Sequence, residues 1–486
     1  MELLPSSWAW IIIIVSGILM FGSSWWIYKK SKVNDAETFM VASRGVKWGL
    51  IAASVAATEL WAGSLLAAAE GAYTWGVAGL YIYWLPTPIS FTIFAFIATR
   101  VRKLTPDGVT IGSFAKQRFG KSGHIIFTLI AIWIMALFTM LQIIGGAAFF
   151  SGMFDIGYTT TAIVLAAIFL GFYLIAGLWS TLITSYIQYF IVVLILLVMV
   201  PAVYIKLGGA GNIYDMMVAN LGNAEPEKLN LFRLDAITNY LLVQFFSFGA
   251  IATLSNYAWQ RAFAVEESGV KKGLIWGGWS WAPLAMVSTL VGVVGLALGL
   301  KLDYPSDVFP RVISEVLSTP FSVFLAVAVL FAIYSTGSAY LGAISSLVTS
   351  DIYEQYINKK ASPQQSLTFI RLSSVVIAIL IVIATILLQK VSLLTAMLTV
   401  GAFVGAPFFP IVLGLWWKKT SSFAVVTAIS VSVVLVSIFL LTNIIPQWLA
   451  YLICILTSLV LTILLSIIKP DNFDFNQLKE DLNQNT

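Results

Sequence analysis

Thirteen apolar stretches follow one another along the chain and limit its fold more than any other feature. Most contain about 20 residues, which is enough for a helix rising 1.5 Å per residue to cross a hydrocarbon core of roughly 30 Å. With 59% hydrophobic and 10% charged residues, the 486-residue chain has too little polar surface to enclose a water-soluble core. The sequence therefore predicts an all-α protein of about thirteen helices embedded in a lipid bilayer. The stretches lie near 8–28, 46–70, 77–99, 123–152, 160–177, 179–205, 237–258, 273–299, 319–350, 369–389, 392–417, 422–442 and 447–468.

The distribution of basic residues predicts how these helices are oriented. Cytoplasmic loops of membrane proteins keep an excess of Lys and Arg. One set of alternate loops holds most of the 27 basic residues, Arg261 among them, whereas the other set holds Lys206, Lys228, Arg233, Lys301, Arg311 and Lys390. We expect an N-terminus outside the cell membrane and a C-terminus in the cytoplasm, with 470–486 as a short tail. The net charge of +5 is typical of such an inner face and does not indicate nucleic-acid binding.

Several functional classes lack support in the sequence. No Gly-rich phosphate loop, metal cluster or nucleophile with its base is recognisable, so we expect a transport function and not an enzyme or an ATP-driven pump. Nothing indicates an obligate protein partner. The lone histidine, His124, lies at a cytoplasmic helix start, and we interpret it as a surface residue and not as a metal ligand.

Two stretches carry Gly and hydroxyl residues at mid-span, where transporters built from inverted repeats have broken helices. Residues 54–76 contain Thr58, Glu59, Gly63 and Ser64, and residues 244–261 contain Ser247, Gly249, Ser255 and Asn256. A third stretch, 332–353, carries a run of small hydroxyl residues. Close helix packing is an alternative explanation for such residues on any single helix.

Glu59 is a carboxylate well inside a predicted span, which costs several kcal/mol unless the side chain faces a cavity or a partner. The sequence shows no basic residue at mid-span to pair with it. We predict that Glu59 faces a functional cavity; a structural hydrogen bond to a neighbouring broken helix remains the alternative.

Four segments in chain order resemble signature segments of the sodium:solute symporter family. They are EGAYTWGVAGL (70–80), AGLWSTLITSYIQ (176–188), NYAWQRAFA (256–264) and AIYSTGSAYLGAISSLVTSDIY (332–353). Members of this family carry proline, sugars, sialic acid, choline or urea. The resemblance implies a leucine-transporter-like fold in one transporter domain, 1–486, with two inverted five-helix repeats at 46–205 and 237–417.

The resemblance also implies a site for a sodium ion. Ala57 and Leu60 would supply carbonyl oxygens from the first broken helix, and Ala332, Ser335 and Thr336 would face them from the third stretch. Spacing of i, i+3 and i+4 places the last three on one helical face. Neutral oxygens suit a monovalent cation, whereas calcium usually recruits carboxylates.

Two positions depart from the family pattern. Ser185 stands where the family's T-D-x-x-Q segment has Asp, and Ala339 stands where members with a second sodium site have a hydroxyl. Both changes remove oxygen ligands, so we expect one sodium ion per transport cycle. The alternative is that Ser185 is a tolerated variant and that other residues set the stoichiometry.

The family alignment places a further set of residues around the solute. They are Glu59, Trp61, Ser64, Tyr83, Gln142, Phe248, Ala252 and Asn256. Aromatic rings beside one carboxylate favour a neutral or positively charged small molecule. No mid-span arginine is evident to bind a carboxylate group, so an organic acid is not expected. The sequence predicts sodium-coupled import of a small solute; a proton-coupled or uncoupled carrier using Glu59, or a transporter-like sensor, are the alternatives.

Overall fold

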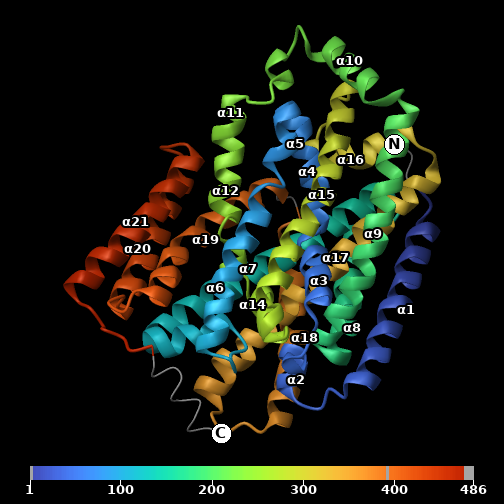
Figure 1. Cartoon of the computed structure of the whole chain (residues 1–486). Coiled ribbons are helices and arrows are strands. Elements are labelled where there is room, and N and C mark those ends of the chain that lie inside the picture. Colours follow the sequence, from blue (N-terminus) through green and yellow to red (C-terminus); the bar gives the residue numbers. More distant parts are fainter. Residues whose placement is uncertain (1–3, 390–392, 476–486) are drawn as a thin grey trace.

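The structure, a computed structural model, describes residues 4–389 and 393–475, and helices make up nearly all of them (Figure 1). Within this part of the chain, β-type pairing is limited to two isolated bridges, Leu4 with Phe154 and Val46 with Val265. The predicted all-α class is confirmed. Lys390 and residues 476–486 of the predicted tail lie outside the described residues.

The bounds of the helices are as follows. The α-helices are α1 (Ser6–Ser31), α2 (Ala36–Val41), α3 (Trp48–Glu59), α4 (Ala62–Trp75), α5 (Gly79–Ile82), α6 (Pro86–Leu104), α7 (Ile111–Met153), α8 (Tyr158–Ala176), α9 (Leu178–Lys206), α10 (Gly209–Leu221), α11 (Leu234–Ala236), α12 (Leu242–Phe248), α13 (Ile251–Leu254), α14 (Asn256–Ala264), α15 (Val270–Ala297), α16 (Val308–Val316), α17 (Thr319–Ser346), α18 (Pro363–Leu387), α19 (Leu393–Trp416), α20 (Ser422–Thr442) and α21 (Gln447–Ile468). Short 3-10 or π segments are η1 (Ala42–Arg44), η2 (Gly76–Ala78), η3 (Pro226–Leu229), η4 (Ile237–Leu241), η5 (Glu267–Gly269), η6 (Pro305–Asp307) and η7 (Leu347–Ile357).

Eleven helical runs of the described residues are long and apolar enough to cross a membrane, compared with thirteen predicted stretches. The predicted stretch 46–70 is broken, and its second half continues through α5 into α6 as one run, Ala62–Leu104. The predicted stretch 392–417 corresponds to α19 (Leu393–Trp416), a continuous helix. The break within 46–70, with its second half joined to the next stretch, therefore accounts for one unit of the difference.

The first broken helix is interrupted at Leu60 and Trp61. Leu60 leaves the helical region (φ −83°, ψ 62°), and Trp61 is extended (φ −80°, ψ 162°). The Ser64 hydroxyl then donates to the Trp61 carbonyl oxygen at 2.8 Å as α4 begins. Gly63 is required here, because the Trp61 ring fills the space that a Cβ at this position would occupy. The break predicted from the mid-span Gly and hydroxyls thus lies where the sequence placed it.

The second broken helix is interrupted twice. After α12, Gly249 and Ala250 leave regular α-helix, and Ala250 has φ −116° and ψ −2°. Ser255 is extended (φ −80°, ψ 105°) between α13 and α14. Helix interruptions at membrane depth are tolerated where neighbouring protein satisfies the freed backbone groups.

The broken helices lie at the centre of the bundle. α15 packs along α3, α4 and α6, whereas α17 packs along α7, α8 and α9. α3 contacts α9, α15 and α17, so it lies between these two groups. In Figure 1, α1 flanks the bundle on one side, α19–α21 extend on the other, and α10 and α16 lie near the top.

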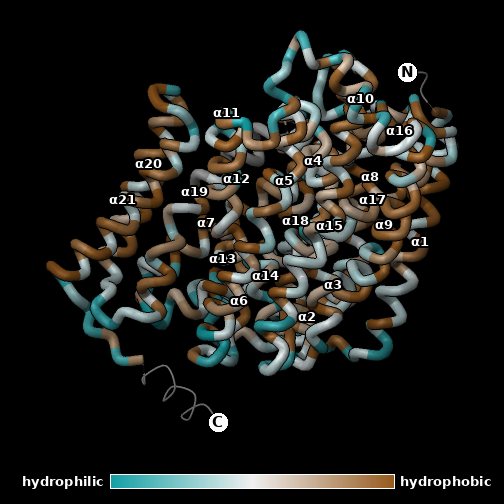
Figure 2. Tube along the Cα trace, turned by 45° about the horizontal axis from the view of Figure 1, so that its top comes forward, coloured by the Kyte–Doolittle hydropathy of each residue, from teal (hydrophilic) through white to brown (hydrophobic). Residues whose placement is uncertain are grey.

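Polar residues gather at the two ends of the bundle. Figure 2 shows a broad hydrophobic zone across the middle, with hydrophilic residues mostly at the top and bottom. α1 begins near the end that carries α10 and α16, and α21 ends near the opposite end (Figure 1). Opposite placement of the first and last helix ends fits an odd number of crossings.

Candidate functional site

The predicted cation site lies where α17 meets the end of α3. The Thr336 hydroxyl donates to the main-chain carbonyl oxygen of Thr58 at 2.7 Å. Ala57, Leu60, Ala332, Ser335 and Thr336 are all at most 3% exposed. The fold therefore brings the α17 face and the broken end of α3 together, as a site shared between them requires. The oxygens available in this region are neutral hydroxyls and main-chain carbonyls.

Ser185 on α9 joins this region from a third helix. Its hydroxyl oxygen lies 2.9 Å from that of Ser335. The Thr184 hydroxyl donates to the Ser180 carbonyl oxygen on its own helix at 2.8 Å, and Ser338 donates to the Ser335 carbonyl oxygen at 3.3 Å. The position that distinguishes this chain from the family pattern is therefore in contact with a predicted sodium ligand.

A very small cavity of about 10 Å³ lies beside the break. Its lining residues are Glu59, Trp61, Tyr83, Thr87, Gln244, Phe248 and Trp281. They come from the break itself, the α5–α6 region, α12 and α15. Four of the eight predicted solute residues, Glu59, Trp61, Tyr83 and Phe248, are thus brought together around one space.

The other four predicted solute residues are buried but do not line this cavity. The Ser64 hydroxyl bonds back to Trp61, and the Ala252 N–H donates to the Ser90 hydroxyl at 3.3 Å. Gln142 Oε1 accepts from the Ala62 N–H at 3.2 Å, at the first residue of α4. Asn256 Nδ2 donates to the Ala343 carbonyl oxygen on α17 at 3.1 Å.

Three residues that line the cavity were not predicted from the sequence as solute-binding residues: Thr87, Gln244 and Trp281. Thr87 lies four residues after Tyr83, and Gln244 lies four residues before Phe248, so helical spacing from two predicted residues could have found them. Trp281 on α15 gave no such signal. Its indole Nε1 is buried and has no hydrogen-bond partner among the described residues.

Glu59 has a buried basic neighbour, which corrects the expectation that none exists. The Tyr257 hydroxyl donates to Glu59 Oε1. Arg261 is fully buried, and its charge acts on Glu59. The placement of Arg261 in a cytoplasmic loop was wrong, because α14 continues to Ala264 and its last turn packs against α3.

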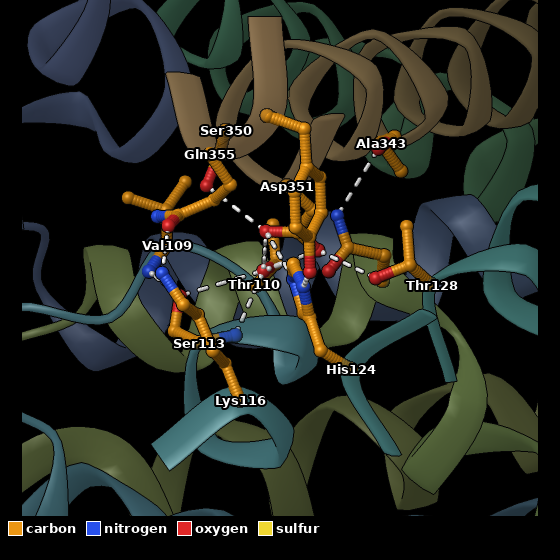
Figure 3. Close-up of polar contacts among 12 residues, drawn as sticks. Val109, Thr110, Ser113, Lys116, His124, Thr128, Ala343, Ser350, Asp351 and Gln355 are labelled. Carbon is orange, nitrogen blue, oxygen red and sulfur yellow. Dashed lines mark hydrogen bonds and ion pairs between the residues drawn. The ribbon is translucent and has the colours of Figure 1, made fainter. Parts of the chain in front are cut away.

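His124 is also buried, contrary to the predicted surface position; it is 1% exposed. Its Nε2 lies 3.8 Å from Asp351 Oδ1, and its Nδ1 lies 2.7 Å from the Tyr356 hydroxyl. Figure 3 shows Thr110 and Thr128 converging on the same carboxylate, and their hydroxyls donate to it at 2.7–3.2 Å. This cluster fastens η7, at the end of α17, to the first part of α7.

A larger hollow of about 500 Å³ lies toward the end of the bundle that carries α16. Leu66 of α4, Gly145 and Phe149 of α7, and residues of the 301–311 segment line it. Leu66 lies on α4, five residues after Trp61 of the break.

Known proteins with similar sequences are transporters and not enzymes. The chain is 28% identical over 433 residues to the urea-proton symporter DUR3 of Oryza sativa subsp. japonica, a match that covers 82% of this chain and 60% of that protein. It is 27% identical over 373 residues to the probable urea active transporter 1 of Schizosaccharomyces pombe, a match that covers 72% of this chain and 56% of that protein. The chain thus spans less than two thirds of the length of these urea transporters. The chain is also 26% identical to the osmoregulated proline transporter OpuE of Bacillus subtilis, and this match covers 88% of this chain and 87% of that protein.

Solved structures and a family profile agree with these matches. A sodium-coupled sialic acid symporter, solved in a substrate-bound outward-open state, superposes with a TM-score of 0.81 over 95% of this chain and 98% of that chain, at 17% identity. Mhp1, a nucleobase-cation-symport-1 transporter, superposes with a TM-score of 0.58 at 13% identity, covering 91% and 98%. These likenesses confirm the predicted leucine-transporter-like fold. Because the profile of the sodium:solute symporter family matches residues 39–430, most of the sequence and the whole of the central bundle, the chain belongs to that family.

Proposed function

We propose that this protein is a sodium-coupled symporter that imports urea, or a neutral solute of the same size and polarity, by alternating access. One observation carries the proposal. Thr58 presents its carbonyl oxygen to Thr336, and the next residue, Glu59, lines the small cavity. Consecutive residues at a helix break thus belong to the cation region and to the solute region, which gives the two ligands a direct means of coupling.

The oxygens at the cation region support sodium as the coupling ion. A neutral ligand set for a monovalent cation would consist of two side-chain hydroxyls and three main-chain carbonyl oxygens. The hydroxyls are those of Ser335 and Thr336, and the carbonyl oxygens are those of Ala57, Leu60 and Ala332. Ser185 adds a neutral hydroxyl beside Ser335 and no charge. This chemistry fits one sodium ion per cycle.

The residues that line the cavity support a small, flat and polar solute. These side chains must move apart to admit it, because a space of about 10 Å³ holds about one water molecule. The rings of Trp61, Tyr83, Phe248 and Trp281 provide apolar walls, and the Glu59 carboxylate can accept N–H groups. The unpartnered indole N–H of Trp281 and the amide of Gln244 can donate to a carbonyl oxygen. Urea offers both kinds of group in one plane, and several relatives bear the names of urea transporters.

The remaining parts of the proposal concern topology. Residues 46–205 and 237–417 would form the two inverted repeats whose relative movement exposes the sites to each side in turn. Basic residues near the α2, α14 and α18 ends favour a cytoplasmic location for that face, with the start of α1 outside the cell membrane.

Proton coupling is the second candidate, because Glu59 is a buried carboxylate in the cavity and one relative is named a urea-proton symporter. In that case Glu59 would take up the proton. Glu59→Gln keeps the size of the side chain but cannot carry a proton, so it would abolish proton-driven uptake. Under sodium coupling, the same variant would still concentrate urea on a sodium gradient, with a weaker affinity.

The deciding experiment is uptake of labelled urea by the full chain in proteoliposomes. An inward sodium gradient, an inward proton gradient and an equal potassium gradient would each be imposed on the same preparation. We expect accumulation with sodium. Accumulation with the proton gradient alone would favour the second candidate, and no accumulation under any gradient would contradict urea symport. A thermal-shift measurement with urea, with and without sodium, would report binding independently, since a ligand stabilises the state that it binds.

A further inference from the structure

Arg261 is a buried charge that neither proposed site uses as a ligand. Its side chain is fully buried in the last turns of α14. Nε and Nη2 donate to the Ser54 hydroxyl at 3.1 and 2.9 Å, and Nη2 also donates to the Thr58 hydroxyl at 3.0 Å. A guanidinium remains charged in proteins, and burying it is costly unless its charge is compensated. The hydrogen bonds to neutral hydroxyls satisfy its N–H groups but leave the charge to be balanced.

Tyr257 connects this charge to Glu59. The guanidinium carbon of Arg261 lies 5.1 Å from the centre of the Tyr257 ring, and its Nη1 donates to the Tyr257 carbonyl oxygen at 3.1 Å. The hydroxyl at the far end of the same ring donates to the Glu59 carboxylate. Cation, ring and carboxylate thus form a continuous row from α14 to the end of α3.

The two charges stand in different positions relative to the cavity. Glu59 is the one acidic residue among the seven that line it, and none of the seven is basic. Arg261 is absent from the lining and lies behind Glu59, through Tyr257. A solute in the cavity can therefore touch the carboxylate, but it also experiences the positive charge behind it. The pair presents a hydrogen-bond acceptor without a large net negative charge.

We infer that Arg261 is a specificity-determining positioning residue that makes the cavity select neutral solutes over cations of the same shape. This inference rests on the proposed urea site. A cation would be attracted by the Glu59 carboxylate and repelled by the Arg261 guanidinium, so that the two effects oppose each other. A neutral amide keeps its hydrogen bond to Glu59 and is not repelled by Arg261. Without Arg261, the same cavity would hold an uncompensated carboxylate and would favour a flat cation.

Urea and guanidinium are suitable probes, because both are flat, three-armed molecules with N–H donors and they differ in charge. The full chain would be purified, and the inhibition of labelled urea uptake by each compound at millimolar concentration would be measured, together with the thermal shift that each produces. We expect wild type to prefer urea. In Arg261→Gln, the ratio of guanidinium to urea affinity should rise by about tenfold or more, equivalent to ~1.4 kcal/mol. Arg261→Lys retains a charge and should return the ratio toward that of wild type.

Arg118→Gln is the matched control. Arg118 is also buried, but its guanidinium bonds to the carbonyl oxygens of Gly414, Trp417 and Thr420, away from the cavity. Loss of this arginine should lower thermal stability and leave the affinity ratio unchanged. A change of ratio in Arg118→Gln equal to that in Arg261→Gln would overturn the inference, since any buried arginine would then have the same effect.

The outcome also separates this inference from the proposed function. If wild type binds urea and Arg261→Gln keeps the same ratio, Arg261 does not set selectivity and the inference fails alone. If wild type does not bind urea, the proposed function fails. Should Arg261→Gln not fold, Tyr257→Phe tests the same row by removing only the hydroxyl that binds Glu59. The affinity for guanidinium relative to urea should rise in that variant too, and an unchanged ratio of the two affinities would contradict the inference.

Discussion

The hydroxyl of Thr336 donates a 2.7 Å hydrogen bond to the carbonyl oxygen of Thr58, which is the residue immediately before Glu59. Thr336 belongs to the helix that packs on α7, α8 and α9, whereas Thr58 belongs to the broken helix that packs on α15. A cation bound between them would hold these two groups of helices together beside the solute cavity. Release of either ligand would then weaken the position of the other, as reciprocal linkage requires.

We expect the double variant Ser335→Ala and Thr336→Ala to lose nearly all sodium-driven urea uptake. Two hydroxyl ligands are removed from a site that has few, so the sodium concentration for half-maximal uptake should rise by at least about tenfold, equivalent to ~1.4 kcal/mol. Insertion into the membrane should continue, because both side chains are small and alanine is well tolerated in helices. The measurement is initial uptake over a range of sodium concentrations.

Ser437→Ala is the control for this double variant. Its hydroxyl bonds back to the Val433 carbonyl oxygen on the same helix, α20, at 2.8 Å. In Figure 1, α20 lies on the side of the bundle opposite α1. It should leave sodium dependence unaltered. Normal sodium affinity in the double variant would show that the cation binds elsewhere.

Trp281→Phe should reduce urea affinity about fivefold, because it removes the indole N–H while keeping an aromatic ring in the cavity wall. A lost neutral hydrogen bond typically costs ~1 kcal/mol. Trp279→Phe is a close control, since Trp279 is 43% exposed and its Nε1 donates to Thr92 at 3.1 Å, away from the cavity. Competition by unlabelled urea in uptake assays measures both. Equal affinities in the two variants would remove Trp281 from the solute site.

Trp281 also shows why part of the site could not be read from the sequence. Trp276, Trp279 and Trp281 lie within six residues of an apolar helix, yet two of them are exposed and one is 2% exposed. Helical periodicity shows that they point in different directions, but only the packing of α15 on α3, α4 and α6 decides which one faces the cavity. Aromatic content alone cannot make that choice.

Charged residues near helix ends were the other source of error. Arg261 follows one predicted apolar stretch and His124 lies at the start of another, so the sequence predicted that both are exposed to water. In the fold, neighbouring helices bury both side chains. By contrast, the first break was predicted well, because a Gly, two hydroxyl residues and a carboxylate at mid-span conflict with a regular lipid-facing helix. Local conflicts of this kind are visible in sequence, whereas burial by distant segments is not.

Asp351→Asn should destabilise the protein by ~2 kcal/mol without altering sodium or urea affinity. Hydroxyls of Thr110, Thr128 and Ser350 all donate to this carboxylate, and an amide offers only one oxygen to them while its NH₂ faces a donor. The measurement is the midpoint of thermal unfolding together with uptake kinetics. Asp235→Asn, at an exposed ion pair with Arg233, should change stability by less than about 0.5 kcal/mol. A large loss of urea affinity in Asp351→Asn would connect this cluster to transport.

The coupling ratio follows from the oxygens around Ser185. Ser185 lies 2.9 Å from Ser335, and the hydroxyls of Thr184 and Ser338 are engaged with main-chain oxygens nearby. A second buried cation would lose several kcal/mol of hydration, and without a carboxylate the two hydroxyls already engaged with main-chain oxygens are too few to offset this loss. We therefore expect initial uptake to depend hyperbolically on sodium, with a Hill coefficient close to one.

Ser185→Asp combined with Ala339→Ser would test this ratio in the opposite direction. The aspartate would place a carboxylate next to Ser335, and the new serine would lie one residue from Ser338 on α17, so the pair adds the ligand types that a second cation needs. Sodium dependence should become sigmoidal, and the ratio of charge to urea carried per cycle should rise. Ser185→Asn with Ala339→Ser is the uncharged control and should remain hyperbolic. A sigmoidal curve in the unmodified protein, matched by two charges per urea, would show that a second ion already binds through other residues.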